Sequence, residues 1–145
     1  MRTVMSTTSL YAISDNDRAS PGALWAGRVI SGLVVAFLLM DAGMKLVPLD
    51  IVLSASNEFG IPSHLTRGLG VLLLICTLLY AFPRTSVLGA ILLTGYLGGA
   101  LYTHLRIDSP LFTHVLFGVY VGVLAWGGLW LRNPRLRALM PWQHA

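Results

Sequence analysis

Four long apolar segments, joined by short polar connections, make up most of this chain of 145 residues. The third segment, at 86–105, reads SVLGAILLTGYLGGALYTHL and carries no formal charge. As an α-helix, at about 1.5 Å per residue, it would be about 30 Å long, which is the thickness of the hydrocarbon core of a bilayer. Gly95, Gly98 and Gly99 in its middle predict that neighbouring helices approach its backbone closely. We therefore expect a membrane-spanning helix here, at the centre of a bundle.

The other three apolar segments are bounded by residues that typically begin or end helices. The first, at 21–46, follows Ser20 and starts with Pro21, an N-cap residue and a proline at the first helical position. The second covers about 64–82, and the fourth covers 110–131. These boundaries predict an all-α fold, an integral membrane bundle of four transmembrane helices.

Short amphipathic segments accompany the four spans. Apolar residues within 49–59 have the spacing of a short helix that lies in the membrane interface. The predicted domain organisation is a flexible tail at 1–20, the four-helix domain at 21–131 and an amphipathic tail at 132–145. In the C-terminal tail we expect Leu136, Leu139 and Met140 to face lipid, and Arg135 and Arg137 to face water.

The composition excludes several classes of protein. Hydrophobic residues make up 55% of the chain and charged residues 11%, whereas soluble domains carry about 25% charge. The net charge of +4 is not arranged as a basic stripe with interleaved aromatic residues, so we predict no nucleic-acid partner. The single cysteine, Cys76, excludes an internal disulfide and a CxxC pair.

Basic residues are distributed unequally between the two sides of the predicted bundle. The side with both termini holds Arg2, Arg18, Arg28, Arg84, Arg132, Arg135 and Arg137, and the other side holds Lys45, Arg67 and Arg106. Cytoplasmic segments of membrane proteins carry an excess of Lys and Arg. We therefore predict a multi-pass protein of the inner membrane with both termini in the cytoplasm.

Ionisable side chains at membrane depth are costly, and they mark the first places to look for function. Five of them fall within a turn or two of the non-cytoplasmic surface in the predicted topology. They are Asp41, Lys45, His104, Arg106 and His114. Their shared depth predicts a polar pocket that opens to this surface.

Asp41 and Lys45 allow two interpretations. Their i,i+4 spacing, with the acid first, favours a structural ion pair along one helix. A pair between Asp41 and Arg106 across the bundle would have the same structural role. Alternatively, Asp41 accepts a proton or orients a ligand in the predicted pocket.

His104 and His114 lie at the same depth on consecutive helices, which two histidine ligands of a metal ion or a haem would require. The chain has no HExxH motif and few further ligands, so we do not expect a metal or haem site. A hydrogen-bonded network that closes the mouth of the bundle, or a pocket for a polar headgroup such as a quinone ring, fits better. Because the chain has no motif of an autonomous enzyme, any electrons must be carried by a cofactor or a partner.

Several stretches resemble a known family. They are GLGVLLLICTLLYAFPRTSVLGAILLTGYLGGALYTHLR at 68–106 and PLFTHVLFGVYVGVLAWGGLWLRNPRLRALMP at 110–141, with the Asp41–Lys45 pair and Phe-Gly-Ile-Pro at 59–62. Over 25–141 the chain resembles the DoxX-like family of small bacterial four-helix membrane proteins. The resemblance implies a bacterial inner membrane and an association with membrane redox complexes, because the family name comes from the small subunit of a thiosulfate–quinone oxidoreductase. Thiol-relay roles of the broader group do not carry over to a chain with one cysteine.

Two classes of function follow from these observations. We predict an accessory or small-molecule-binding subunit of a membrane redox system, with a quinone as the ligand to test first. The alternative is a non-catalytic membrane scaffold or a helper in small-solute transport. The expected partners are the lipid bilayer, a membrane redox protein and a second copy of the chain, since the glycine faces suit packing within one chain or between chains.

Overall fold

The computed structural model describes residues 20–47 and 49–139, and within them it contains helices and no strand. In chain order the elements are α2 (Pro21–Leu46), α3 (Asp50–Glu58), α4 (Ser63–Ala81), α5 (Ser86–Arg106), η1 (Leu111–Val115), α6 (Phe117–Arg132) and α7 (Pro134–Leu139). Four helical segments are long and apolar enough to cross a membrane, the fourth being η1 together with α6. The predicted all-α membrane bundle is therefore confirmed. The predicted tail at 1–20 lies outside the described residues, except for Ser20.

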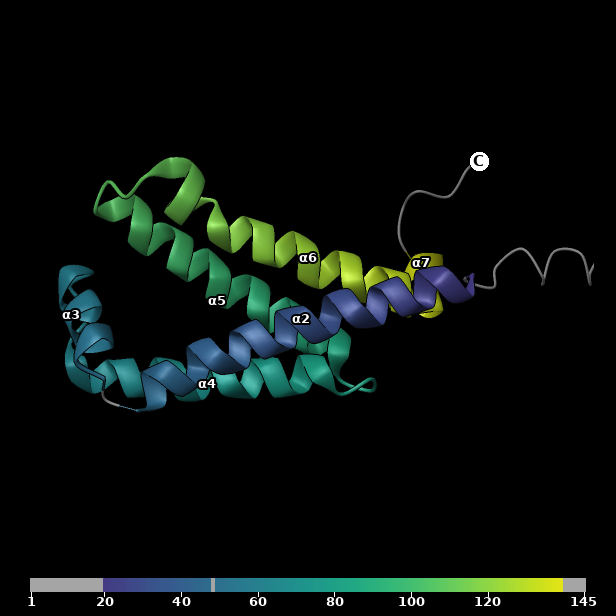
Figure 1. Ribbon diagram of the computed structural model, residues 1–145, viewed down its shortest axis with the longest axis horizontal. Helices are drawn as coiled ribbons and strands as arrows, with labels where there is room; N and C mark the ends of the chain where they lie inside the picture. Colours follow the sequence, from purple (N-terminus) through teal and green to yellow (C-terminus); the bar gives the residue numbers. More distant parts are fainter. Residues whose placement is uncertain (1–19, 48, 140–145) are drawn as a thin grey trace, which may run out of the picture.

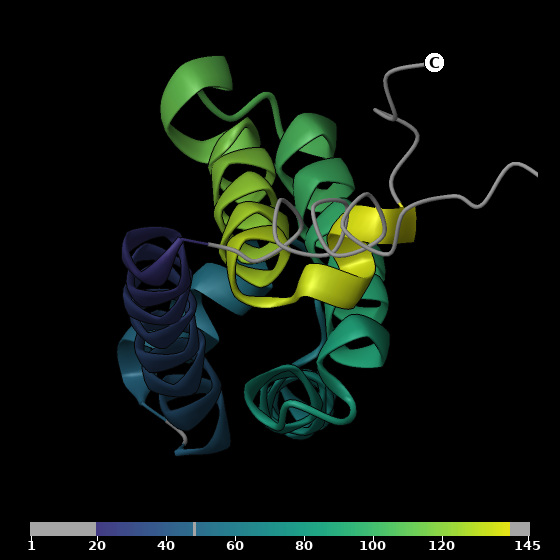
Figure 2. The ribbon, with the colours of Figure 1, turned by 90° about the vertical axis from the view of Figure 1, so that its right-hand side faces the viewer.

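The four long helices form a ring. Helix α2 packs against α4 and α6, and α5 completes the ring by packing against the same two helices. Viewed along its length, the bundle shows the four helices side by side around a common core (Figure 2). The connection at 82–85 is so short that α4 and α5 are antiparallel neighbours.

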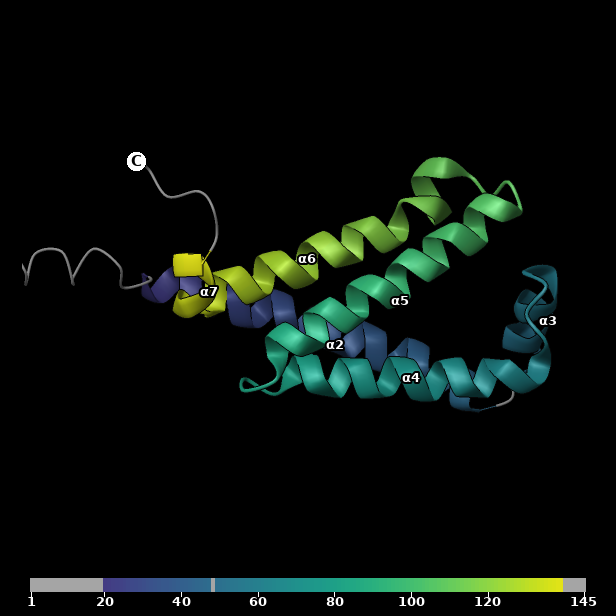
Figure 3. The same ribbon diagram turned by 180° about the vertical axis from the view of Figure 1, so that it is seen from behind.

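The bundle has two ends, which we name by what they carry (Figure 1). The loop end holds α3, which lies across the long helices, and the connection at 107–110. The terminal end holds the start of α2, the turn at 82–85 and α7. Toward the loop end, α5 and α6 diverge from α2 and α4 (Figures 1 and 3).

Helix α5 is not the centre of the bundle, so this expectation was wrong. Among the described residues, no heavy atom lies within 4 Å of a Cβ built on Gly95, Gly98 or Gly99. Their half of α5 diverges from α2 and α4, and the three glycines are exposed. No helix of the ring is central, and α2 packs most extensively because it buries residues at helical spacing toward both neighbours.

Other glycines make the close helix contacts. A Cβ built on Gly89 of α5 would overlap the backbone nitrogen of Tyr80 on α4. Gly128 of α6 faces Ser31 of α2, where the corresponding distance to Ser31 Oγ is 2.7 Å. Close approach of helix backbones at small residues is the usual packing mode in membranes, where lipid tails are as apolar as the core.

A buried hydrogen-bond network ties three helices together. The Tyr80 hydroxyl on α4 is fully buried and donates to the Ala125 carbonyl of α6 at 2.7 Å. It also lies 3.1 Å from Ser31 Oγ on α2. Since no water is present in the hydrocarbon core, each of these polar groups needs a partner inside the protein. The network therefore fixes α2, α4 and α6 against one another.

The C-terminal helix packs more tightly than the sequence predicts. Leu136 of α7 is partly buried and packs against the main core instead of facing lipid. The Arg137 Nε donates to the Trp130 carbonyl of α6 at 3.0 Å, and its guanidinium lies over the Trp130 ring. Arg137 therefore satisfies a carbonyl group at the C-terminus of α6, which amphipathic spacing alone does not reveal.

The close α4–α5 contact gives a direct test of the packing. We expect Gly89→Ala to lower the free energy of unfolding by about 1–3 kcal/mol, because the methyl group would overlap the Tyr80 backbone. Denaturant titration of the protein in micelles, followed by circular dichroism, measures this effect.

Gly95→Ala is the matched control on the same helix. Its methyl group meets open space, so we expect an unchanged or slightly higher free energy of unfolding. Equal effects of the two substitutions would contradict the predicted difference in packing.

Candidate functional site at the loop end

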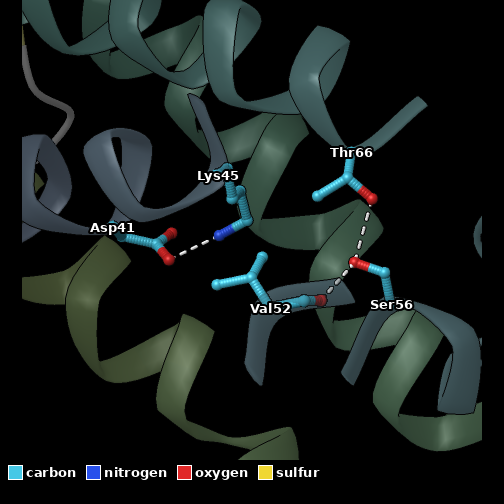
Figure 4. Close-up of polar contacts among 5 residues, drawn as sticks. All are labelled: Asp41, Lys45, Val52, Ser56 and Thr66. Atoms are coloured by element: carbon cyan, nitrogen blue, oxygen red, sulfur yellow. Dashed lines mark hydrogen bonds and ion pairs between the residues drawn. The ribbon is translucent and has the colours of Figure 1, made fainter. Parts of the chain in front are cut away.

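The ion pair predicted from the i,i+4 spacing is present at the C-terminal end of α2. Lys45 Nζ donates to Asp41 Oδ1 (Figure 4). The two side chains are 24% and 29% exposed, so the pair is shielded from solvent only in part. Arg106 is not the partner of Asp41, because its guanidinium donates to the Phe59 carbonyl instead.

Lys45 also lines a cavity at the loop end, which has a volume of about 410 Å³. The end of α2, the first half of α3 and the start of α4 form its walls. One part of the lining is aliphatic, and the rest is polar or basic. The aliphatic residues are Val47, Val52 and Leu53, and the polar or basic ones are Lys45, Ser63, His64, Thr66 and Arg67.

Two hydroxyl groups hold α3 in place beside this cavity. Thr66 Oγ1 on α4 donates to Ser56 Oγ on α3 at 2.9 Å, and Ser56 Oγ donates to the Val52 carbonyl at 2.8 Å (Figure 4). Thr66 and Ser56 are both buried. On the opposite wall, a Cβ built on Gly70 would lie 2.9 Å from Lys45 Cβ, so the backbones of α2 and α4 approach closely here. This close packing against α4 fixes the position of the α2 backbone at Lys45.

The other three residues predicted for the site form a second cluster, around Phe59. The His104 ring lies edge-on to the Phe59 ring at 4.8 Å and 5.8 Å from the His114 ring. Arg106 Nη2 donates to the Phe59 carbonyl at 2.9 Å. His104 Nδ1 lies within hydrogen-bond distance, 3.2 Å, of Ser109 Oγ. This cluster joins the C-terminal end of α5 to the turn that follows α3.

Glycine is required in that turn. Gly60 has a φ of +68°, a conformation that side chains with a Cβ rarely adopt. A Cβ built there would also lie 2.7 Å from Arg106 Nη2. Gly60 therefore lets the chain turn after α3 and leaves room for the arginine that binds Phe59.

The fourth span does not begin as the regular α-helix predicted from 110. It starts with the π-helical turn η1, in which the Leu116 N–H donates to the Leu111 carbonyl at 2.9 Å. In a regular helix, the i,i+4 spacing would place His114 and Gly118 on one face, and the wider turn changes this relation. Gly118 packs against Leu97 of α5, whereas the His114 side chain is exposed and lies beside the His104 ring.

The five residues predicted for the site thus lie at one end of the bundle in two groups. Asp41 and Lys45 belong to the cavity side, and His104, Arg106 and His114 belong to the cluster around Phe59. Within the described part of the chain, no three His, Cys, Asp or Glu side chains are placed to hold a metal ion. The ligand-binding role of the five residues remains a prediction.

Sequence reasoning missed His64 and Arg67 as cavity residues. The place of His64 in the outer loop predicts a solvated side chain, and the side chains of His64 and Arg67 are both exposed. Both lie in the first turns of α4 and line the cavity together with Val52 and Leu53 of α3. A usable signal was the amphipathic segment at 49–59, because its packing face must cover part of a neighbouring helix.

The hydroxyl contact between α3 and α4 can be tested separately. We expect Thr66→Val to destabilise the docking of α3 by about 1 kcal/mol, the usual net value of a lost hydrogen bond. Amide hydrogen exchange of residues 50–58 should become correspondingly faster. Thr77→Val is the matched control, because the Thr77 hydroxyl is buried but donates within α4 to the Leu73 carbonyl. Unchanged exchange in Thr66→Val, or an equal change in the control, would contradict this role of Thr66.

Comparison with known proteins identifies a family for this chain. The family model described as the DoxX-like family matches residues 29–128, which include both groups of predicted site residues. Searches of curated proteins and of solved structures returned no match. The match covers more than half of the chain, and the helices have the length and composition of membrane spans. The chain is therefore a small integral membrane protein that belongs to the DoxX-like family.

Proposed function

We propose that this protein binds the headgroup of a quinone in the loop-end cavity and acts as an accessory subunit of a membrane redox system. The observation that carries the proposal is the mixed lining of the cavity. Lys45, His64 and Arg67 offer hydrogen-bond donors, and Val47, Val52 and Leu53 offer an aliphatic surface. A volume of about 410 Å³ is in the range of small-molecule sites.

The donors suit the chemistry of a quinone ring. Quinone carbonyl oxygens accept hydrogen bonds, and the flat ring packs against aliphatic side chains. An ammonium group has three N–H donors, so Lys45 can bind Asp41 and still donate to a ligand. In this proposal Asp41 orients Lys45, while His64 and Arg67 offer donors from the opposite wall, on α4. Electrons come from a redox partner and not from this chain.

The cluster around Phe59 has a positioning role in the proposal. Arg106 binds the Phe59 carbonyl, and His104 contacts the Phe59 ring. These contacts hold the turn that follows α3, and this turn leads directly into Ser63 and His64 of the cavity lining. His104, Arg106 and His114 thus support the wall of the site.

A scaffold is the second candidate function, and the exposed glycine face of α5 favours it. A Cβ built on Gly95, Gly98 or Gly99 would meet no other helix within 4 Å in the described part of the chain, and such faces favour helix association in membranes. A redox partner or a second copy of the chain would pack there. Purification of a ligand-free complex that dissociates on Gly98→Leu would support this function over quinone binding.

The distribution of charge supports a bacterial inner membrane with both chain termini in the cytoplasm. In the described part of the chain, the terminal end carries Arg28, Arg84, Arg132, Arg135 and Arg137, and the loop end carries Lys45, Arg67 and Arg106. An excess of arginine near the ends of spans favours the cytoplasmic side. The quinone site would then face the opposite side of the membrane.

Quinone binding should depend on the donors of the cavity. We expect the double variant Asp41→Asn/Lys45→Met to raise the Kd of a short-chain quinone about ten-fold, because a charged hydrogen-bond donor is lost. The double substitution avoids leaving the partly buried Asp41 carboxylate without its partner. Titration of the protein in lipid nanodiscs measures the Kd. His64→Ala, on the opposite wall, should weaken binding as well.

Arg84→Gln is the control for these variants, because it removes one positive charge from the opposite end of the bundle. We expect its Kd to equal that of the unmodified protein. Equal affinity in all variants, or no saturable binding by the unmodified protein, would refute the proposed site.

The orientation makes a separate prediction. A fluorescent protein fused to the C-terminus should fluoresce, because it folds in the cytoplasm, whereas alkaline phosphatase fused there should be inactive. Alkaline phosphatase inserted after Asp108, at the loop end, should be active. The reverse pattern would place the loop end in the cytoplasm.

A further inference from the structure

A second cavity lies at the terminal end, far from the quinone site. Its volume is about 230 Å³, and its lining comes from the first half of α2 and the C-terminal ends of α4 and α6. The lining residues are Arg28, Ser31, Gly32, Val35, Ala81 and Arg132. Because α2 starts at this end, Arg28 lies near the membrane surface and Val35 lies about 10 Å deeper. The cavity is therefore cationic at its surface side and apolar toward the interior.

Arg132 places a partly buried cation beside this cavity. Its Nη2 donates to the Tyr80 carbonyl at 3.0 Å, and the guanidinium lies over the Tyr80 ring. Its Nε is buried and has no hydrogen-bond partner among the residues that the structure describes. These contacts orient the guanidinium but do not neutralise its charge, which is costly near the edge of the hydrocarbon core.

No described carboxylate compensates the charge of either arginine. The ion pair within residues 20–47 and 49–139 is that of Lys45 with Asp41, at the other end of the bundle. The acidic residues of this part of the chain, Asp41, Asp50, Glu58 and Asp108, all lie at the loop end. The terminal-end cavity therefore has a positive field from two arginines and no counter-charge from the described protein.

We propose that this cavity binds the phosphate group of an anionic phospholipid. The phosphate lies between Arg28 and Arg132, and the glycerol and the start of an acyl chain lie against Gly32 and Val35. Leu39 lies one turn beyond Val35 on the same face of α2 and is exposed, so it offers an apolar surface for the rest of the acyl chain. Basic pockets between membrane helices commonly bind anionic headgroups. This site is independent of the proposed quinone site in its place, its charge and its ligand.

Free phosphate shares the anionic chemistry, but it leaves the deeper apolar part of the cavity unused. The two sources differ in a way that can be measured. A phospholipid is retained when the protein is transferred from vesicles to the gas phase, and inorganic phosphate, which cannot fill the space beside Val35, should not displace it.

Native mass spectrometry of the full chain tests the proposal. The protein is taken from vesicles of phosphatidylcholine mixed with phosphatidylglycerol, and from vesicles of phosphatidylcholine alone. We expect a single phosphatidylglycerol adduct in the first case and none in the second. Arg28→Gln should reduce the adduct about five-fold, the effect of one basic residue near an anionic surface. The Arg28 side chain is exposed, so this variant should fold normally.

A second variant blocks the cavity and keeps both charges. No atom lies within 4 Å of a Cβ built on Gly32, so Gly32→Leu adds a side chain to the cavity without displacing the backbone. We expect this variant to lose the adduct. Gly127→Leu is its control, because Gly127 on α6 also has no neighbour within 4 Å but does not line the cavity. Arg84→Gln is the control for Arg28→Gln, since it removes a charge from the same end outside the cavity.

The outcomes separate the alternatives. An about five-fold reduction of the adduct in Arg28→Gln and its loss in Gly32→Leu, with retention in both controls and in the presence of millimolar inorganic phosphate, support a phospholipid site. An equal loss in Arg84→Gln would show a diffuse surface charge effect and overturn the proposal. Retention of the adduct in Gly32→Leu, or its displacement by inorganic phosphate alone, would also overturn it.

Discussion

The absence of water in the hydrocarbon core is the constraint on which the whole structure depends. Each polar group at that depth must find a partner inside the protein or move to an end of the bundle. The Tyr80 hydroxyl illustrates the first solution, because it binds the Ala125 carbonyl and lies beside Ser31 in the core. The arginines and the Asp41–Lys45 pair illustrate the second, since they lie toward the two ends. Both cavities have polar or basic linings, and both therefore lie at the ends of the bundle.

The two ends differ in chemistry. The loop end carries both signs of charge, and α3 covers it through the Thr66–Ser56 contact, so a cavity forms next to an oriented lysine. The terminal end carries several arginines and, among the described residues, no acidic side chain. Two of these arginines line a cavity whose deeper part is apolar. In our proposals the loop end therefore binds a neutral acceptor of hydrogen bonds, whereas the terminal end binds an anion from the membrane.

The sequence predicts the features that depend on neighbouring residues along the chain. Ser20 and Pro21 mark the start of α2, and the Ser20 hydroxyl accepts a hydrogen bond from the Ala23 N–H. The i,i+4 pair of Asp41 and Lys45 is another local feature, and the structure contains it. Span lengths and the family resemblance follow in the same way, because apolar length and short motifs are read directly from the chain.

Features that depend on the distance between helices could not be predicted. The spacing of Gly95 and Gly99 resembles a packing motif, yet Gly89 makes the close contact, because α5 diverges from α4 beyond this point. The π-helical turn that carries His114 has no sequence signal that we recognise. His64 belongs to a cavity only because α3 folds over the start of α4, which periodicity within each segment does not show.

The most direct test of the central claim is a structure of the protein in lipid nanodiscs saturated with a short-chain quinone. The proposed function predicts density for the ring between α2, α3 and α4, with a carbonyl oxygen within hydrogen-bond distance of Lys45 or His64. An empty loop-end cavity under saturating quinone, or quinone density at another surface of the bundle, would contradict it.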